Sequence, residues 1–154
     1  MKTYQIIRKQ FLPIDLETSW AFFSSPGNLS VITPPRMRFQ IMAQSGGDKM
    51  REGQMIVYRV TVLPLVRLTW VTEIVRMEEP LTFTDEQRKG PYSLWRHRHQ
   101  FQKVPGGIEM TDTIEYAIPF GWLGQLANYL FVAREVNRIF DYRFRILETR
   151  FKNT

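Results

Sequence analysis

The segment Gly121–Phe151 constrains the fold most, because no proline interrupts it and its apolar residues recur at helical spacing. The stripe at three- and four-residue steps contains Leu126, Leu130, Ala133, Phe140, Phe144, Leu147 and Phe151. Asn137 lies within this stripe. Val136, Ile139 and Ile146 make it wider than the seam of a coiled coil. We therefore predict one long helix whose broad apolar face packs against a sheet.

The composition indicates one globular domain with an aromatic interior. With 154 residues, the chain is long enough to bury a core of its own, and we predict a single domain over residues 1–154. Aromatic residues make up 14% of the chain, so they must either fill a large core or line a cavity. The absence of cysteine excludes disulfides, thiolate metal sites and cysteine nucleophiles.

The charge pattern argues against a nucleic-acid partner. The net charge is +6, but the basic residues are spread along the chain with carboxylates among them, and no helix-turn-helix or basic run is present. Met1–Phe11 contains scattered charges and no long apolar core, so neither a signal peptide nor an integral membrane segment is predicted. We therefore expect a cytoplasmic protein that does not bind nucleic acid.

The first part of the chain predicts a strand followed by two short helices. Tyr4–Leu12 is rich in residues that favour strands and ends at Pro13. Asp15 can cap a helix over Leu16–Ser24, where apolar residues recur at helical spacing. Asn28–Ile32 can form one further helical turn before two successive prolines force extended backbone.

Between residues 37 and 118, extended segments alternate with breaks at glycine or proline, which indicates an antiparallel meander. The segments are Arg38–Ala43, Gln54–Leu63, Val66–Met77, Leu81–Arg88, Leu94–Val104 and Ile108–Ile118. The clearest hairpin turn is Pro105–Gly107. The predicted fold class is therefore α+β, with about seven antiparallel strands, two short helices after the first strand and a long C-terminal helix.

Side chains alternate across a strand, so the face covered by the long helix can be assigned by parity. The chemically informative residues on that face are Tyr58, Trp70, Trp95, His97, His99, Phe101, Asp112 and Tyr116. A short hairpin at Gly106–Gly107 places Asp112 opposite or diagonal to His99 or Phe101. Both histidines of the chain and one carboxylate are thus expected to face the long helix.

Several motifs carry a resemblance to a known group of proteins. They are Trp20-Ala21-Phe22-Phe23, Pro26-Gly27-Asn28-Leu29, Thr33-Pro34-Pro35, Phe83-Thr84-Asp85-Glu86-Gln87, Gly90-Pro91-Tyr92, the run from Trp95 to Phe101, and Met110-Thr111-Asp112. Together with the long final helix, they resemble a bacterial branch of the START-like, helix-grip superfamily (SRPBCC), which includes polyketide cyclases, aromatases and lipid-transfer domains. The resemblance implies a curved antiparallel sheet wrapped around the C-terminal helix, with an apolar ligand cavity between them.

The two histidines are the first candidates for chemistry. His97 and His99 are two residues apart on one strand, so both imidazoles project from the same face, as metal ligands can. Asp112 is the best-placed third ligand, and Asp85 and Glu86 are more distant alternatives. Because two histidines without an assured third ligand make a poor site, we predict no bound metal, and we expect no cofactor. Hydrogen bonding within the covered face and contact with a ligand are the alternative roles.

The leading hypothesis is that the chain binds a small, largely apolar molecule, either aromatic, polyketide-like or lipid, between sheet and helix. The predicted ligand-binding residues are Tyr58, Trp70, Trp95, His97, His99, Phe101, Asp112, Tyr116, Leu130, Ala133 and Asn137. The helix is thinnest near Ala133, so Ala133→Trp is expected to block binding. One alternative is a cyclase, aromatase or hydrolase that uses His97, His99 and Asp112. Another is a ligand-gated interaction module, which an exposed apolar patch would favour.

Overall fold

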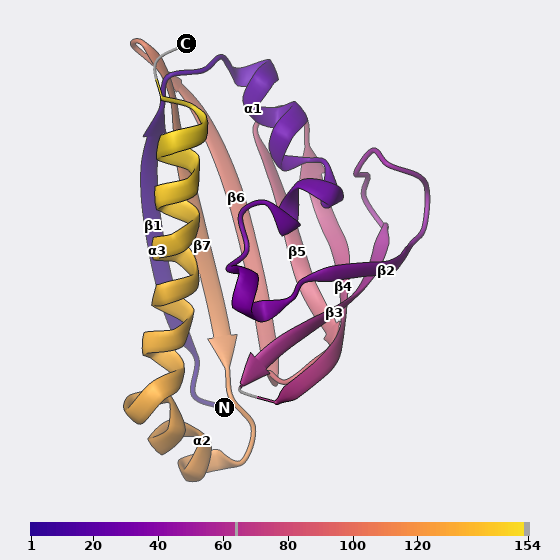
Figure 1. Ribbon diagram of the computed structural model, residues 1–154, viewed down its shortest axis with the longest axis vertical. Helices are drawn as coiled ribbons and strands as arrows, with labels where there is room; N and C mark the ends of the chain where they lie inside the picture. Colours follow the sequence, from indigo (N-terminus) through magenta and orange to yellow (C-terminus); the bar gives the residue numbers. More distant parts are fainter. Residues whose placement is uncertain (64, 153–154) are drawn as a thin grey trace.

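Seven antiparallel strands form one sheet in the computed structural model, which describes residues 1–63 and 65–152 (Figure 1). The strands are β1 (Tyr4–Leu12), β2 (Gln40–Gln44), β3 (Met55–Leu63), β4 (Val66–Glu78), β5 (Thr82–Lys89), β6 (Leu94–Val104) and β7 (Gly107–Ala117). Their order in the sheet is β1-β7-β6-β5-β4-β3-β2, so β2 to β7 form a meander and β1 pairs with β7. The predicted α+β class and antiparallel meander are confirmed.

Three short helical segments follow β1. α1 (Leu16–Phe23) begins after Asp15, whose side chain accepts a hydrogen bond of 2.7 Å from the backbone N–H of Thr18. Two 3-10 helices come next, η1 (Pro26–Ser30) and η2 (Pro35–Met37), and both have proline in the first turn. The second predicted helical turn is therefore a 3-10 helix. The second of the two successive prolines begins η2 instead of continuing extended backbone.

The long C-terminal helix is present, but it consists of three parts. These are α2 (Gly121–Ala127), η3 (Asn128–Val132) and α3 (Ala133–Arg150). η3 is a π-helix, which holds more residues per turn than the α-helices on either side. Within it, the buried side chain of Asn128 accepts a hydrogen bond of 2.7 Å from the Tyr116 hydroxyl. The π-helix therefore lies where the helix is attached to the end of β7.

The buried face of α3 agrees with the predicted stripe at Val136, Phe140 and Leu147, but it also contains Arg143. Leu126 and Leu130 of the predicted stripe are instead 47% and 53% exposed. Apolar residues occur on more than one side of this helix, so spacing alone fits two stripes, and the π-helix changes the register between α2 and α3. The buried Arg143 also makes the buried face harder to recognise from the sequence, because a charged residue is normally assigned to solvent.

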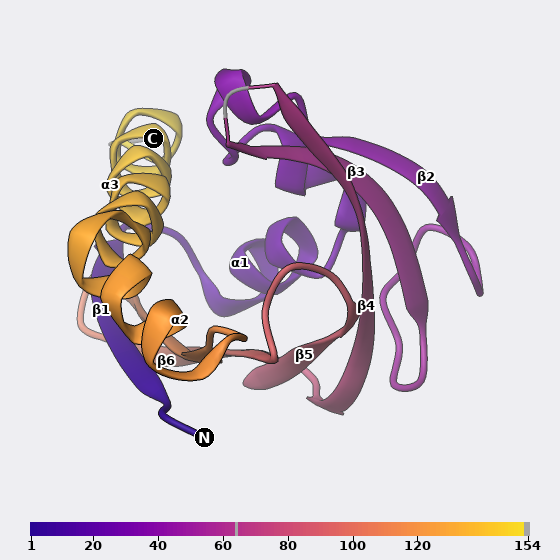
Figure 2. The same cartoon turned by 90° about the horizontal axis from the view of Figure 1, so that it is seen from below.

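The sheet is strongly curved, and the main helices lie on its concave side. Figure 2 shows the sheet bending from β1 round to β2, with α1 and α3 on the inside of the curve. Register shifts between β2 and β3, β3 and β4, and β4 and β5 mark irregularities that bend this half of the sheet. α1 packs on β6 and β7, and α3 lies along β1. This is the helix-grip arrangement that the resemblance implied.

The parity assignment of the strands is confirmed. His97 and His99 on β6 are 5% and 4% exposed, whereas Arg96 and Arg98 between and beside them are exposed. His99 lies directly opposite Asp112 in the pairing of β6 with β7, and Asp112 is 2% exposed. Both histidines and the carboxylate are therefore on the covered face, as predicted.

The interior under α1 is filled by aromatic side chains, and we call this region the closed end. It comprises Trp20, Phe22, Phe23, Phe83 and Phe101, all of which are buried. Trp20 meets Phe83 and Phe101 edge-on, with ring centroids 5.7 and 6.0 Å apart. Phe22 and Phe23 pack against each other at 5.0 Å. Edge-to-face contacts of this kind stabilise an aromatic core beyond the area they bury.

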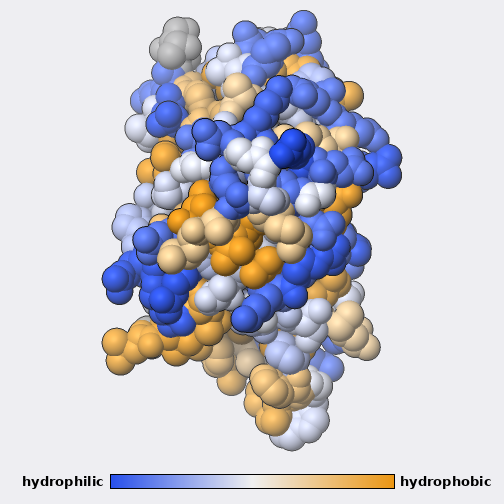
Figure 3. All heavy atoms as spheres, turned by 90° about the vertical axis from the view of Figure 1, so that its right-hand side faces the viewer, coloured by the Kyte–Doolittle hydropathy of each residue, from blue (hydrophilic) through white to orange (hydrophobic). Residues whose placement is uncertain are grey.

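The surface is unevenly polar. Figure 3 shows hydrophilic side chains over much of one face, with hydrophobic residues in its middle and at its lower end. Across the residues that the structure describes, no helix combines the length and the apolar character needed to cross a membrane.

Candidate functional site

A pocket of about 160 Å³ lies between the concave face of the sheet and α3. Its apolar lining includes Phe39, Tyr58, Val60, Trp70, Trp95 and Ile139. Its polar lining includes Asp85, His97, His99, Glu135 and Arg143. The pocket therefore has an aromatic wall from β3, β4 and β6, and a group of ionisable side chains beside it.

The aromatic wall is a continuous series of ring contacts. Tyr58 and Trp70 are stacked with ring centroids 5.9 Å apart, and Trp95 meets Trp70 edge-on at 5.6 Å. Phe39 extends the series, 4.7 Å from the ring of Tyr58. The indole Nε1 of Trp70 is enclosed and has no hydrogen-bond acceptor among the described residues. An enclosed donor without an acceptor is unusual in a folded protein.

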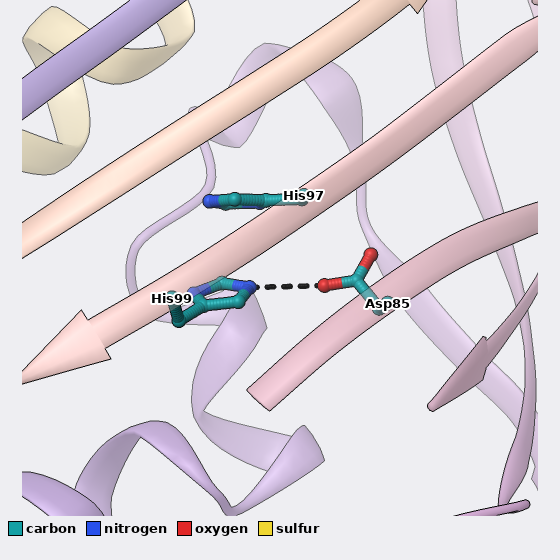
Figure 4. Close-up of side chains that lie close together, drawn as sticks. All are labelled: Asp85, His97 and His99. Atoms are coloured by element: carbon teal, nitrogen blue, oxygen red, sulfur yellow. Dashed lines mark hydrogen bonds and ion pairs between the residues drawn. The ribbon is translucent and has the colours of Figure 1, made fainter. Parts of the chain in front are cut away.

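The ionisable side chains form what we call the polar cluster, which consists of Asp85, His97, His99 and Asp112. His97 Nε2 donates a hydrogen bond of 2.8 Å to Asp112 Oδ1. His99 Nε2 donates one of 2.9 Å to Asp85 Oδ2, the contact drawn in Figure 4. His99 Nδ1 is 3.4 Å from the same oxygen of Asp112. Each histidine is thus paired with a carboxylate on a neighbouring strand, His97 across to β7 and His99 across to β5.

The two imidazole rings lie face to face within a column of rings. The ring centroids of His97 and His99 are 3.7 Å apart, and Phe83 stacks on the other side of His99 at 4.1 Å. Phe140 of α3 meets His97 edge-on at 5.5 Å. Figure 4 shows the two histidine rings one above the other. Stacking and hydrogen bonding together fix both rings in place.

Burial and neighbouring charges separate the pKa values of the two histidines. Burial, reinforced by the adjacent His99, lowers the pKa of His97 to about 4 despite its bond to Asp112. Burial also opposes a charged His99, but the carboxylates of Asp112 and Asp85 outweigh it and raise the pKa of His99. Burial acts against the charge of both carboxylates, but the histidines hold the pKa of Asp85 below its ordinary value and that of Asp112 well below. Near neutral pH, His97 is therefore neutral, whereas His99 keeps its proton to a higher pH than an ordinary histidine.

Arg143 brings a buried guanidinium from α3 to the pocket. The residue is 8% exposed and its guanidinium carbon lies 4.8 Å from the ring centroid of Phe140. Burial lowers the pKa of Arg143, and the charges of Asp112 and Asp85 partly offset this effect. Its Nε is enclosed without a hydrogen-bond acceptor among the described residues. Trp70, with its enclosed Nε1, lines the same pocket, and so does His99, whose Nδ1 also lacks a hydrogen-bond partner among the described residues.

The polar cluster also contains a possible metal-ligand set. One ligand atom each from Asp85, His97 and His99 lies within 4.8 Å of the others. However, the Nε2 atom of each histidine is already bonded to a carboxylate, and the rings are stacked rather than directed at one point. A metal ion needs ligand lone pairs that converge at about 2.0–2.2 Å. The prediction of no bound metal therefore stands as a prediction, which elemental analysis of the purified protein checks.

The structure brings only part of the predicted site together. Tyr58, Trp70, Trp95, His97 and His99 line the pocket. Phe101 is instead in the closed end, Tyr116 bonds to Asn128, and Asp112 lies behind His97.

On the helix, none of the three predicted residues lines the pocket. Leu130 is exposed, and Asn137 bonds to the backbone oxygen of Ala133. Val136 and Ile139, which widen the predicted stripe, line the pocket instead, together with Arg143.

Sequence reasoning missed one side chain of the pocket, Arg143, and ranked another, Asp85, too low. No sequence pattern indicated that Arg143 is buried, since a single arginine among apolar residues is usually solvated. A pattern did indicate Asp85, because it shares parity with Phe83 on a strand that pairs directly with the histidine strand. In the structure Asp85 lies opposite His97 in the pairing of β5 with β6, so it is a direct partner of the histidines and not a distant alternative.

Solved structures share this fold at low sequence identity. Protein CV1439 from Chromobacterium violaceum has a TM-score of 0.74 at 8% identity, over 97% of this chain and 98% of that one. TTHA0849 from Thermus thermophilus has a TM-score of 0.69 at 14% identity, over 96% and 97%. Major latex-like protein 151 from Panax ginseng has a TM-score of 0.67 at 12% identity, over 98% and 99%. These matches establish a shared fold over nearly the full length.

Comparison of sequences adds nothing to this. Neither a family model nor a curated protein sequence matches the chain.

Proposed function

We propose that the chain binds a compact, mainly apolar molecule that carries an uncharged hydrogen-bond acceptor such as a carbonyl group. The observation that supports this is the pair of enclosed donors, Trp70 Nε1 and Arg143 Nε, on residues of a largely aromatic pocket. An enclosed donor without an acceptor costs about 1–3 kcal/mol. A ligand oxygen between the sheet and α3 relieves that cost, while the rest of the ligand buries apolar surface.

The volume of the pocket limits the size of the ligand. At about 160 Å³ it is similar to the cavity of about 150 Å³ that is known to hold benzene. A molecule of one or two rings is therefore the best fit, and its flat faces match the stacked walls of Tyr58, Trp70 and Trp95. Of the ligand classes considered from the sequence, an aromatic or polyketide-like ring suits this volume better than a two-chain lipid.

The charges around the pocket favour a neutral ligand. The two carboxylates of the polar cluster face the guanidinium of Arg143 and the ring of His99, whose protonated form they stabilise, while His97 is neutral. An anionic ligand adds an uncompensated charge to this buried group, which is costly. A carbonyl oxygen accepts a hydrogen bond from Arg143 without adding a charge, so a ketone, ester or amide fits better than a carboxylate.

A comparison of naphthalene, acetylnaphthalene and naphthoate tests the proposal. Acetylnaphthalene should bind the native chain roughly tenfold more tightly than naphthalene, because its carbonyl gains a hydrogen bond to a charged donor. Naphthoate should bind no better than naphthalene. Arg143→Met replaces the aliphatic part of the arginine side chain but removes the guanidinium. It should abolish the preference for the acetyl compound and leave naphthalene binding intact. Titration calorimetry measures all three affinities.

Two substitutions on α3 locate the bound molecule. Ile139 lines the pocket, so Ile139→Trp should fill it and abolish binding of naphthalene and acetylnaphthalene. Ala133 lies outside the pocket, so Ala133→Trp serves as the matched control and should bind both compounds normally, contrary to the expectation from the sequence. The proposal fails if the native chain binds neither compound, or if Ile139→Trp binds both as the native chain does.

A second candidate function is catalysis, which the 2.8 Å hydrogen bond between His97 and Asp112 favours. A neutral imidazole at the pocket wall, with its tautomer fixed by a carboxylate, has the arrangement of a general base. We infer that such a base would remove a proton from the carbon next to the ligand carbonyl, as enolisation and cyclisation require. A pKa near 4 makes His97 a weak base at neutral pH, which ranks this function second.

Deuterium exchange separates catalysis from binding. If His97 is a base, the native chain should speed the exchange of the methyl protons of acetylnaphthalene in deuterated water, as followed by NMR, and His97→Gln should remove the increase. Binding of the compound should persist in that variant. Exchange at the rate of buffer alone rejects the catalytic function and leaves the binding function untouched.

A further inference from the structure

The segment that follows β7 exposes large apolar side chains to solvent. The most exposed are Phe120, Trp122, Leu123, Leu126, Tyr129 and Leu130. The buried residues of α2 and η3 are instead Gly124 and Asn128. A side chain at Gly124 would clash with the backbone oxygen of Pro119, since its Cβ would lie only 2.2 Å away. The segment is therefore inverted, with small and polar residues toward the protein and apolar residues outward.

A second group of exposed apolar residues lies at the same end of the molecule. Where β3 ends and β4 begins, Leu63, Leu65 and Val66 are 46%, 103% and 39% exposed. Figure 1 shows this turn and α2 in the lower part of the molecule, and Figure 2 shows them on opposite sides of that end. Hydrophobic residues are visible there in Figure 3. We call the surface formed by α2, η3 and the β3–β4 turn the open end.

The backbone holds two of these side chains outward in an unfavourable conformation. Phe120 has φ 76° and Leu65 has φ 67°, so both lie in the left-handed region that bulky residues rarely adopt. Phe120 is 80% exposed and Leu65 is fully exposed. Neither side chain gains burial in return for the strained backbone. Strain of this kind, kept at exposed apolar residues, indicates a function outside the folding of the chain itself.

The open end is also basic. No aspartate or glutamate occurs between residues 53 and 72 or between residues 116 and 134. The basic residues of these two segments are Arg59, Arg67 and Arg134. The next carboxylate along the helix, Glu135, is paired with Arg36 at 2.9 Å and with Arg138 at 3.2 Å. The segments that carry the exposed apolar side chains are therefore basic.

We propose that the open end docks on the surface of a bilayer that contains anionic phospholipids. Its apolar side chains enter the boundary between head groups and acyl chains, where tryptophan and tyrosine are especially favourable. The basic residues of the same segments contact the anionic head groups. A second copy of the chain is a poorer partner, because two open ends brought together place like charges against each other.

The pocket reaches the same end of the molecule. Its lining includes Val62 beside the β3–β4 turn, Tyr92 in the β5–β6 turn, and Glu135 near the start of α3. A docked chain therefore holds its pocket close to the bilayer, where apolar molecules are concentrated. Docking itself does not require that the pocket binds anything, so the two proposals can fail separately.

Vesicle binding tests the proposal. The native chain should sediment with vesicles made of equal parts phosphatidylcholine and phosphatidylserine, bind phosphatidylcholine vesicles far less, and be released by salt. Trp122 is 71% exposed, so its fluorescence should shift to shorter wavelength on binding. Leu65→Ser and Trp122→Ser should each weaken binding by roughly tenfold. Arg134→Gln should weaken binding by about fivefold, and only to the anionic vesicles.

A matched control comes from the opposite end of β4. Leu81 is 51% exposed in the β4–β5 turn, so Leu81→Ser removes a similar apolar side chain and should leave vesicle binding unchanged. Circular dichroism verifies that each variant is folded. The proposal is wrong if the native chain binds neither kind of vesicle, or if Leu81→Ser is as defective as Leu65→Ser. A native dimer that Leu65→Ser and Trp122→Ser convert to a monomer would also overturn it, since a second copy would then cover the open end.

Discussion

The closed end and the open end belong to the same sheet and the same C-terminal helix, but apolar residues are buried at the closed end and exposed at the open end. At the closed end, α1 covers the sheet, and Trp20 is only 4% exposed. At the open end, α2 turns its small and polar residues inward, and Trp122 is 71% exposed. Apolar content therefore does not decide burial in this fold. What decides it is whether a second element supplies a complementary apolar face.

The two tryptophans give the largest expected difference between the ends. Trp20→Ala should lower the free energy of unfolding by about 3–5 kcal/mol, because it leaves a cavity among Phe83 and Phe101. Trp122→Ala should change it by no more than about 0.5 kcal/mol, because the side chain is already in solvent. Urea unfolding measures both. Similar losses for the two variants would show that the open end is packed in solution.

The polar cluster lies between the ends and should make stability depend on pH. The pKa of His97 is about 4 in the folded chain and 6.5 ordinarily. As the pH falls below 6.5, His97 is therefore protonated in the unfolded chain before it is protonated in the folded chain. Stability should therefore decrease by roughly 3 kcal/mol between pH 6.5 and pH 4. His99 has the opposite effect because its pKa is raised in the folded chain. Its contribution to folding stability is complete below pH 6.5 and is lost as the pH rises through its folded-state pKa. Together they predict a maximum of stability near pH 6.5.

Urea unfolding at a series of pH values checks this prediction. His97→Phe keeps a ring in the column between His99 and Phe140 but cannot titrate, so it should remove much of the decrease below pH 6.5. The carboxylates lose their contribution only at still lower pH, because their folded-state pKa values lie below the ordinary 3.8. An unchanged decrease in His97→Phe would assign the acid sensitivity to another group.

The smallest expected effect concerns an ion pair beside the pocket. Arg36 of η2 and Glu135 of α3 both line the pocket and are 2.9 Å apart. The Arg36 side chain is half exposed, so Arg36→Gln should change stability by less than about 1 kcal/mol. It should nevertheless speed the release of acetylnaphthalene in stopped-flow measurements, because the pair joins the two sides of the pocket. Arg76→Gln, which breaks the exposed pair with Glu78, is the matched control and should leave release unchanged.

The strands could be predicted more accurately than the site. A period of two and clear turn residues determined both the strand bounds and the face of His97 and His99, since a register slip would have turned Arg96 and Arg98 inward. The pairing of His99 with Asp85 depends on which strands are neighbours, and parity within one strand does not contain that information. The buried position of Arg143 depends on tertiary charges that no local pattern encodes. For the C-terminal helix, spacing correctly predicted that Val136, Phe140 and Leu147 are buried in α3. The π-helix changes the register before α3, and Leu126 and Leu130 are exposed instead of buried.

Because of the π-helix η3, the orientation of the open end depends on the number of residues in this segment. An α-helix turns by about 100° per residue, so losing one codon within residues 128–132 would restore α-helical geometry and rotate α2 by about that angle relative to α3. The anchoring bond between Asn128 and Tyr116 would no longer be aligned, and a different side of α2 would face the sheet. A single deletion is thus sufficient to change which side chains this end displays, with almost no change in composition. Among homologous chains, a difference of one residue in this helical turn can therefore add or remove the proposed docking surface, even where the residue types are the same.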